Sequence, residues 1–125
     1  MGYVVMTSED KVEKALEYLI SSSEQYAEAS SQAKYYYQYL KEVTVDLLRE
    51  AESTAYMQAE GSQEARKHAA RTSDDYKEIV KMRREALEEY RQWEYKRQRL
   101  ESGRESARIL ISYHQSVMRD RGGMI

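Results

Sequence analysis

The feature that most constrains this chain is a seam of regularly spaced side chains over residues 73–118. Its positions follow alternating steps of three and four, the spacing of a helix that lies along another helix. The pattern therefore predicts one long helix over these residues. The seam consists of Tyr76, Ile79, Arg83, Ala86, Tyr90, Trp93, Arg97, Leu100, Arg104, Ala107, Ile111, His114 and Met118.

A second long helix, over about residues 8–58, is predicted by two rows of side chains with a sevenfold repeat. The first row is Val12, Leu19, Tyr26, Ala33, Leu40, Leu47 and Thr54, and the second is Ala15, Ser22, Ala29, Tyr36, Val43 and Met57. Thr7 or Ser8 would cap the start of this helix, where the acidic side chains of Glu9 and Asp10 interact favourably with the helix dipole.

The connection contains a natural helix stop, Gly61, and then Ser62, which would cap a short helix within residues 61–71. Thr72 or Ser73 would cap the long helix of residues 73–118, and residues 119–125 would form a flexible tail. Because the second long helix returns against the first, we expect an all-α fold. It would be a long antiparallel helical hairpin resembling a coiled coil, with residues 1–125 as a single module.

The composition agrees with this fold and excludes several classes of protein. The chain has no proline, which long helices rarely tolerate, and no cysteine, so disulfides and zinc-thiolate sites are excluded. The first residues lack the basic and apolar regions of a signal peptide, and no stretch is apolar enough to span a bilayer. We therefore expect a soluble cytoplasmic protein with no membrane contact.

Four tyrosines lie within five positions, and they suggest an interface. Consecutive helical residues point about 100° apart, so the four side chains cannot all face one partner helix. Tyr36 and Tyr37 fit the seam, whereas Tyr35 and Tyr39 share another face. Tyrosine in a chain without phenylalanine is typical of aromatic contacts that stay near water. We predict a subunit interface, and stacking of single-stranded bases is the alternative. The predicted interface residues are Tyr35, Tyr36, Tyr37, Tyr39 and Trp93.

Arginine occupies three seam positions, Arg83, Arg97 and Arg104. These side chains would either pair with acids of the first helix or extend along the edge of the seam with only their stems packed. The functional alternative is a basic surface that binds the phosphate backbone of a nucleic acid. Interleaved glutamates favour the structural interpretation. The candidate nucleic-acid contacts are Arg91, Lys96, Arg97, Arg99, Arg104 and Arg108.

The two halves of the chain carry opposite net charge. Residues 1–60 hold five basic and eleven acidic side chains, a net charge of −6, and residues 61–125 hold fifteen and eleven, a net charge of +4. Opposite charges favour the pairing of the two halves.

Residues suited to catalysis are few. Glu64 and His68 lie four apart and could face one metal ion, but such a pair is more often a solvated ion pair. Bundle enzymes with two metals need Glu-x-x-His pairs on two helices, and neither histidine here has a glutamate three residues before it. Glycine-rich phosphate loops and nucleophile elbows are also absent from the sequence. We expect no catalytic residue, no cofactor and no metal.

The second half of the chain carries a recognisable order of residues. Glu60-Gly61 is followed by Glu64-Ala65-Arg66, then Ala70, then Ser73-x-x-Tyr76, and a charged helix that reaches Arg108-Ile109. Over residues 58–115 this order resembles small helical proteins encoded in the recombination and replication modules of phages and prophages, whose biochemical role is generally undefined. The resemblance implies a phage or prophage origin and a place in the host cytoplasm.

These observations lead to the expectation of a non-enzymatic helical interaction protein that forms a homo-oligomer. It would act through contacts with a protein partner, as an accessory to DNA recombination or replication or as an inhibitor of a host factor. The alternative is a nucleic-acid-binding module that uses the basic face of the second helix.

Overall fold

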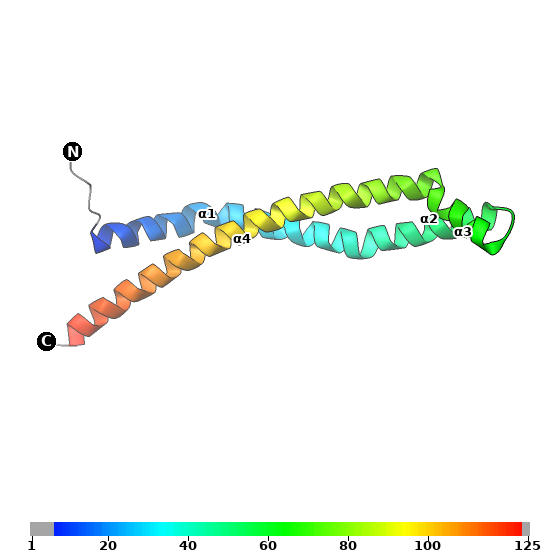
Figure 1. Cartoon of the computed structure of the whole chain (residues 1–125). Coiled ribbons are helices and arrows are strands. Elements are labelled where there is room, and N and C mark those ends of the chain that lie inside the picture. The colour runs from blue at the N-terminus through cyan, green and yellow to red at the C-terminus, as the bar shows by residue number, and fades with distance from the viewer. Residues whose placement is uncertain (1–6, 124–125) are drawn as a thin grey trace, which may run out of the picture. The chain divides into compact units, whose positions relative to one another are not determined.

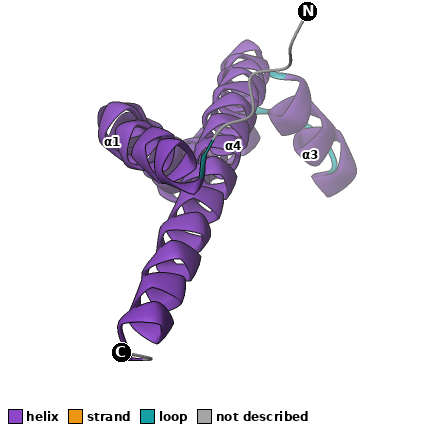
Figure 2. Ribbon diagram, turned by 90° about the vertical axis from the view of Figure 1, so that its left-hand side faces the viewer, coloured by secondary structure: helices purple, strands orange, loops and turns teal. Residues whose placement is uncertain are grey.

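The structure is a computed structural model that describes residues 7–123, and this part of the chain forms helices and no strand (Figures 1 and 2). The elements are α1 (Ser8–Gln38), a π-helical turn η1 (Tyr39–Val43), α2 (Thr44–Gln58), α3 (Gln63–Thr72) and α4 (Asp74–Gly123). The predicted all-α fold, with two long helical stretches and a short connecting helix, is confirmed.

The predicted helix caps are present. The Thr7 hydroxyl accepts a hydrogen bond from the backbone N–H of Asp10 at 3.2 Å, and the Asp10 carboxylate accepts one from the Thr7 N–H at 3.3 Å. Ser62 and Ser73 cap α3 and α4 in the same way, each accepting from the N–H three residues later. Gly61, between α2 and α3, has φ +107°, a conformation that L side chains rarely adopt.

The chain forms two compact units. The first contains residues 1–30 and 95–125, and the second contains residues 31–94. Within each unit the two paired helix segments run antiparallel, as a helical hairpin requires. In the first unit Ala15 and Ala107 line the same groove, and the Leu19 carbonyl contacts Arg104. In the second unit Tyr37 packs against Tyr90 and Val45 lies across from Val80.

The two helix segments of the first unit are in close contact at Gly103. The Tyr18 side chain covers this glycine so tightly that a Cβ atom there would lie 2.5 Å from the Tyr18 hydroxyl oxygen. Toward Ser8 and Gly123 the two segments diverge, as both views show (Figures 1 and 2). The helix α4 passes through Gly103 without interruption.

Two boundaries differ from the sequence prediction. The long helix α4 continues to Gly123, so the prediction of a flexible tail from residue 119 is wrong for residues 119–123; residues 124 and 125 lie outside the described part. The predicted helix over residues 8–58 is continuous but contains η1, in which the Thr44 N–H donates to the Tyr39 carbonyl five residues earlier.

The π-helical turn shifts the seam by one residue. Before it, Ala29 and Ala33 are buried as predicted, but after it Thr44 is buried and Val43 is exposed. Thr54 and Met57, also predicted to face the partner helix, are exposed, whereas the predicted Leu47 is half-buried together with Leu48, Ala51 and Ala55. A π-helical turn is an α-helix with one extra residue, so every later side chain rotates by about 100°.

Candidate interaction grooves beside the π-helical turn

The second unit carries a groove on one side of the pair formed by η1 and α4. Its floor is aliphatic, and its charged side chains are all basic. It encloses about 700 Å³. We call it the basic groove; it is lined by Tyr37, Leu40, Lys41, Val45, Val80, Arg83, Arg84, Leu87 and Tyr90.

A second groove of about 670 Å³ lies on the same unit and has the opposite charge. Three glutamates and two tyrosines dominate its walls. We call it the acidic groove; it is lined by Tyr36, Tyr39, Met82, Glu85, Ala86, Glu88, Glu89 and Gln92. The α4 residues that line the basic groove point about 180° away from those that line the acidic groove, so the two grooves lie on opposite sides of this segment.

Small side chains and η1 together create the grooves. Ala33, Thr44 and Ala86 are buried, and residues of this size leave little side-chain bulk between the two helical segments. The hydroxyl of Thr44 donates to the Leu40 carbonyl at 2.6 Å, which satisfies a polar side chain that is fully buried. Large apolar side chains on either side of such a narrow seam remain partly uncovered, and they line the grooves.

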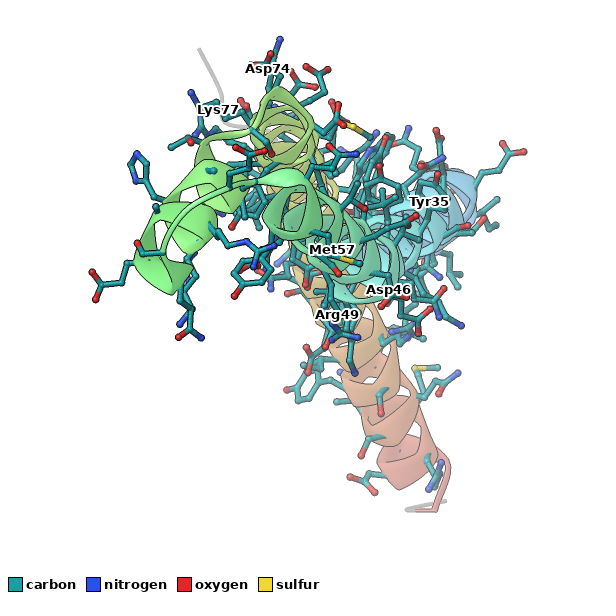
Figure 3. All side chains as sticks on the ribbon, turned by 90° about the vertical axis from the view of Figure 1, so that its right-hand side faces the viewer. Tyr35, Asp46, Arg49, Met57, Asp74 and Lys77 are labelled. Carbon is teal, nitrogen blue, oxygen red and sulfur yellow. The ribbon has the colours of Figure 1, made fainter. Side chains whose placement is uncertain are left out.

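The four tyrosines of the predicted interface divide between two faces. Tyr35 stacks on Tyr39 with ring centroids 6.3 Å apart, and it meets Tyr36 edge-on at 5.1 Å. Tyr37 points to the other side, where its ring lies 5.9 Å from that of Tyr90 and 5.9 Å from the Lys41 ammonium. Tyr35 is 59% exposed (Figure 3). The prediction that Tyr39 faces away from the seam beside Tyr35 is only half right, because Tyr39 also lines the acidic groove with Tyr36.

Trp93, the remaining residue of the predicted interface, is half-buried in the α4 seam. Tyr90 is half-buried on the same helix, whereas Tyr95 is exposed.

Arg104 is a structural contact in the first unit. Its guanidinium donates to the Leu19 carbonyl at 2.7 Å and to the Ser22 hydroxyl oxygen at 2.8 Å, and it lies 5.4 Å from the centre of the Tyr26 ring. Ser22 in turn donates to the Tyr18 carbonyl at 2.5 Å. The seam arginine thus joins α4 to α1 through neutral acceptors, and the predicted pairing with acids of the first helix is wrong at this position.

The other two seam arginines behave differently. Arg97 is half-buried and forms an ion pair with Glu101 of its own helix, at 2.6 Å. Arg83 is exposed and lines the basic groove, which agrees with the alternative that a seam arginine extends along the edge of the seam.

The remaining candidate nucleic-acid contacts do not share a face. Arg91, Lys96, Arg99 and Arg108 are exposed. Within the first unit, the exposed cations Lys96, Arg99 and Arg108 spread over about half of the helix circumference, because consecutive residues point about 100° apart. The sequence prediction had grouped them into one surface.

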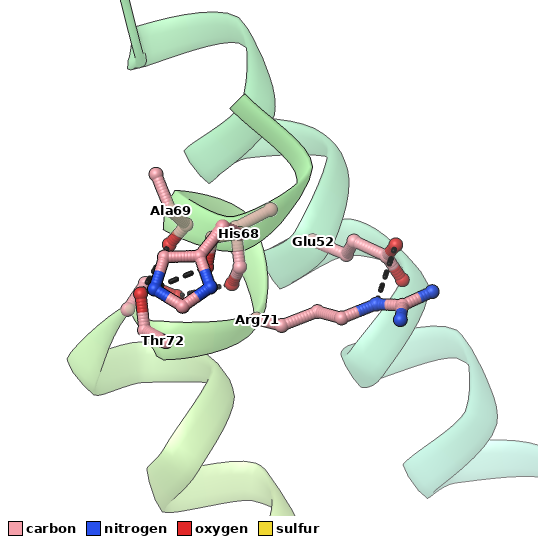
Figure 4. A network of polar contacts seen from close by, with 7 residues as sticks. Glu52, His68, Ala69, Arg71 and Thr72 are labelled. Carbon is pink, nitrogen blue, oxygen red and sulfur yellow. Dashed lines mark hydrogen bonds and ion pairs between the residues drawn. The ribbon is translucent and has the colours of Figure 1, made fainter. Parts of the chain in front are cut away.

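The connection between α2 and α3 is held by polar contacts. Arg66 Nε donates to the Ala59 carbonyl at 3.0 Å, and its guanidinium lies 4.8 Å from the centre of the Tyr56 ring. Glu52 and Arg71 form an ion pair across the two helices at 3.9 Å (Figure 4). This pair is long and largely exposed, so it contributes little to stability.

The described residues contain no group of three or more His, Asp or Glu side chains placed to hold a metal ion. Glu64 and His68 are both exposed on α3. None of the helices in the described range is long and apolar enough to cross a membrane.

No protein-family model, curated protein or solved structure matches this chain.

Proposed function

We propose that this chain is a non-enzymatic helical interaction module that self-associates and acts through contacts between proteins. The observation that carries the proposal is the size of the buried residues. Every buried residue in the described range is small: Ala15, Ser22, Ala29, Ala33, Thr44, Ala70, Ala86 and Ala107. Large apolar side chains, which supply most of the hydrophobic stabilisation of a core, remain partly or largely exposed.

The tyrosines and grooves of the second unit are the surface we assign to this association. Tyrosine is enriched at interfaces because its ring adds apolar contact while its hydroxyl tolerates water. Tyr35, Tyr37 and Tyr39 expose rings on both sides of the helical pair, next to η1. Single π-helical turns are frequent at functional sites.

The biological role we propose follows from the resemblance to phage and prophage proteins. In that setting the module would assist DNA recombination or replication, or inhibit a host factor, by binding a protein. Two of the six candidate nucleic-acid contacts, Arg97 and Arg104, already contact protein groups, which favours a protein partner over the nucleic-acid alternative.

Light scattering coupled to gel filtration tests the self-association over a range of protein concentrations. We expect a dimer or larger species for the native sequence, weakened in a Tyr35→Ala/Tyr39→Ala variant. Tyr113→Ala is the matched control, because this tyrosine is 70% exposed but lines neither groove. A strict monomer at every concentration, unchanged by the tyrosine substitutions, would refute the proposal.

A further inference from the structure

The basic groove has a chemistry that specifies its occupant. Leu40, Val45, Val80 and Leu87 supply an aliphatic floor, and Lys41, Arg83 and Arg84 supply positive charge with no acidic residue in the lining. Grooves of this kind accept an amphipathic helix that inserts apolar side chains spaced by three or four residues. Acids beside those side chains would complement the cations.

Such a helical face exists on α1 of the same chain. Leu16 and Ile20 lie four residues apart, so they project from one side of the helix, and they are 46% and 76% exposed. Glu13, Glu17 and Glu24 are exposed along one flank of this pair. We call this surface the acidic ridge, defined by Glu13, Leu16, Glu17, Ile20 and Glu24.

A second exposed apolar pair lies on α4, but its charged neighbours differ from those of the acidic ridge. On α4, Ile109 and Tyr113 are 62% and 70% exposed and also lie four residues apart. Their neighbours Glu105 and Arg108 carry opposite charges, so this pair offers no net complement to a basic groove. The acidic ridge combines exposed aliphatic side chains with charge of one sign, which the groove requires.

We infer that the basic groove of one copy binds the acidic ridge of a second copy. The inference rests on the self-association proposed above and names the surfaces that form it. Ile20 and Leu16 insert between the aliphatic side chains of the groove, while the three glutamates lie against Lys41, Arg83 and Arg84. Each copy carries one ridge and one groove, so every copy offers both surfaces of the contact.

Sedimentation velocity of the full chain tests the apolar part of the contact. Ile20→Ser is expected to raise the dissociation constant of self-association at least tenfold, because it removes one buried aliphatic side chain from every contact between a ridge and a groove. Ile109→Ser is the matched control and should change it less than twofold. Circular dichroism should be unaltered in both, since each isoleucine is exposed within one chain.

Charge reversal tests the pairing of the two surfaces. A chain with Glu13→Lys and Glu17→Lys, and another with Arg83→Glu and Arg84→Glu, should each associate at least tenfold more weakly than the native chain. Mixed in equal amounts, the two variants should associate with each other with near-native affinity, because each ridge then meets a groove of opposite charge.

The outcomes separate this inference from the proposed function. If the native chain self-associates and Ile20→Ser matches Ile109→Ser, the ridge is not the occupant, and self-association through another surface stands. Failure of the mixture to recover affinity overturns the pairing of ridge and groove. A native chain that is monomeric at every concentration overturns both.

Discussion

Replacing Arg104 by methionine should destabilise the helical pair of the first unit. The arginine makes two hydrogen bonds to α1, one to a backbone carbonyl and one to the Ser22 hydroxyl, and its guanidinium lies against the Tyr26 ring. Methionine keeps an unbranched apolar stem of similar reach and a similar helix propensity. The substitution therefore removes the polar contacts and leaves most of the packing.

The size of the effect follows from opposing contributions. Two hydrogen bonds from a charged donor and the ring contact together contribute about 3–6 kcal/mol. Against this, Arg104 Nε is buried with no hydrogen-bond partner among the described residues, which costs about 1–3 kcal/mol and is relieved by the substitution. We expect a net loss of about 2 kcal/mol in the free energy of unfolding.

Urea unfolding followed by circular dichroism measures this loss, with the protein concentration fixed because association also changes apparent stability. Arg108→Met is the control: this arginine is exposed one turn later on α4, and the change should stay within about 0.5 kcal/mol. In a double-mutant cycle with Ser22→Ala, a coupling of about 1 kcal/mol is expected. Equal stability of Arg104→Met and Arg108→Met, or additive effects in the cycle, would show that the guanidinium does not join the helices.

Three further outcomes are expected. Gly61→Ala should lower stability by about 1 kcal/mol or more in thermal unfolding, because φ +107° is strained for any residue with a Cβ atom, and an unchanged midpoint would contradict that geometry. Ser73→Ala should cost about 1 kcal/mol by removing the α4 cap, whereas Ser73→Asp should retain stability; equal loss in both would argue against capping. Deleting Glu42 should convert η1 into an α-helix and keep the helical content measured by circular dichroism. Deleting Glu24 should unfold part of α1, because the side chains on one side of the deletion rotate by about 100° out of the seam. Similar effects of both deletions would refute the role of η1.

The seam of α4 could be predicted from the sequence almost position by position. Tyr76, Trp93 and Leu100 are half-buried, and Ala86 and Ala107 are buried, because an uninterrupted helix conserves the phase of its repeat. The serine cap of α4 could also be predicted, since a capping side chain bonds a backbone N–H only three residues later. Arg83 and Met118 are the two predicted seam positions that are exposed. For Arg83 this agrees with the alternative that a long charged side chain extends along the edge of the seam.

The grooves could not be predicted in the same way. They depend on which large side chains flank a narrow seam, and that depends on the exact phase of two paired helices. Tyrosine clustering indicated an interface, but the division of Tyr36 and Tyr37 between an acidic and a basic groove required the partner residues of α4.

The π-helical turn explains both the missed phase and the position of the grooves. An unbroken sevenfold repeat through Tyr36 and Val43 would next place the charged Glu50 in the seam. The missing apolar residue at position 50 was the one sign in the sequence that the seam shifts to other positions. With one extra residue, Thr44 replaces Val43 in the seam, and Leu48, Ala51 and Ala55 follow it while Glu50 remains exposed.

The exchange of Val43 for Thr44 is unfavourable by itself, since it exposes an aliphatic side chain and buries a hydroxyl. It is offset by the hydrogen bond from Thr44 to Leu40 and by a seam of apolar residues throughout α2. The turn therefore corrects the phase between two helical segments whose patterns do not match. Because the correction falls at residues 39–43, Tyr39, Leu40 and Lys41 lie along the grooves, and the surface assigned to association follows from the same extra residue that completes the core.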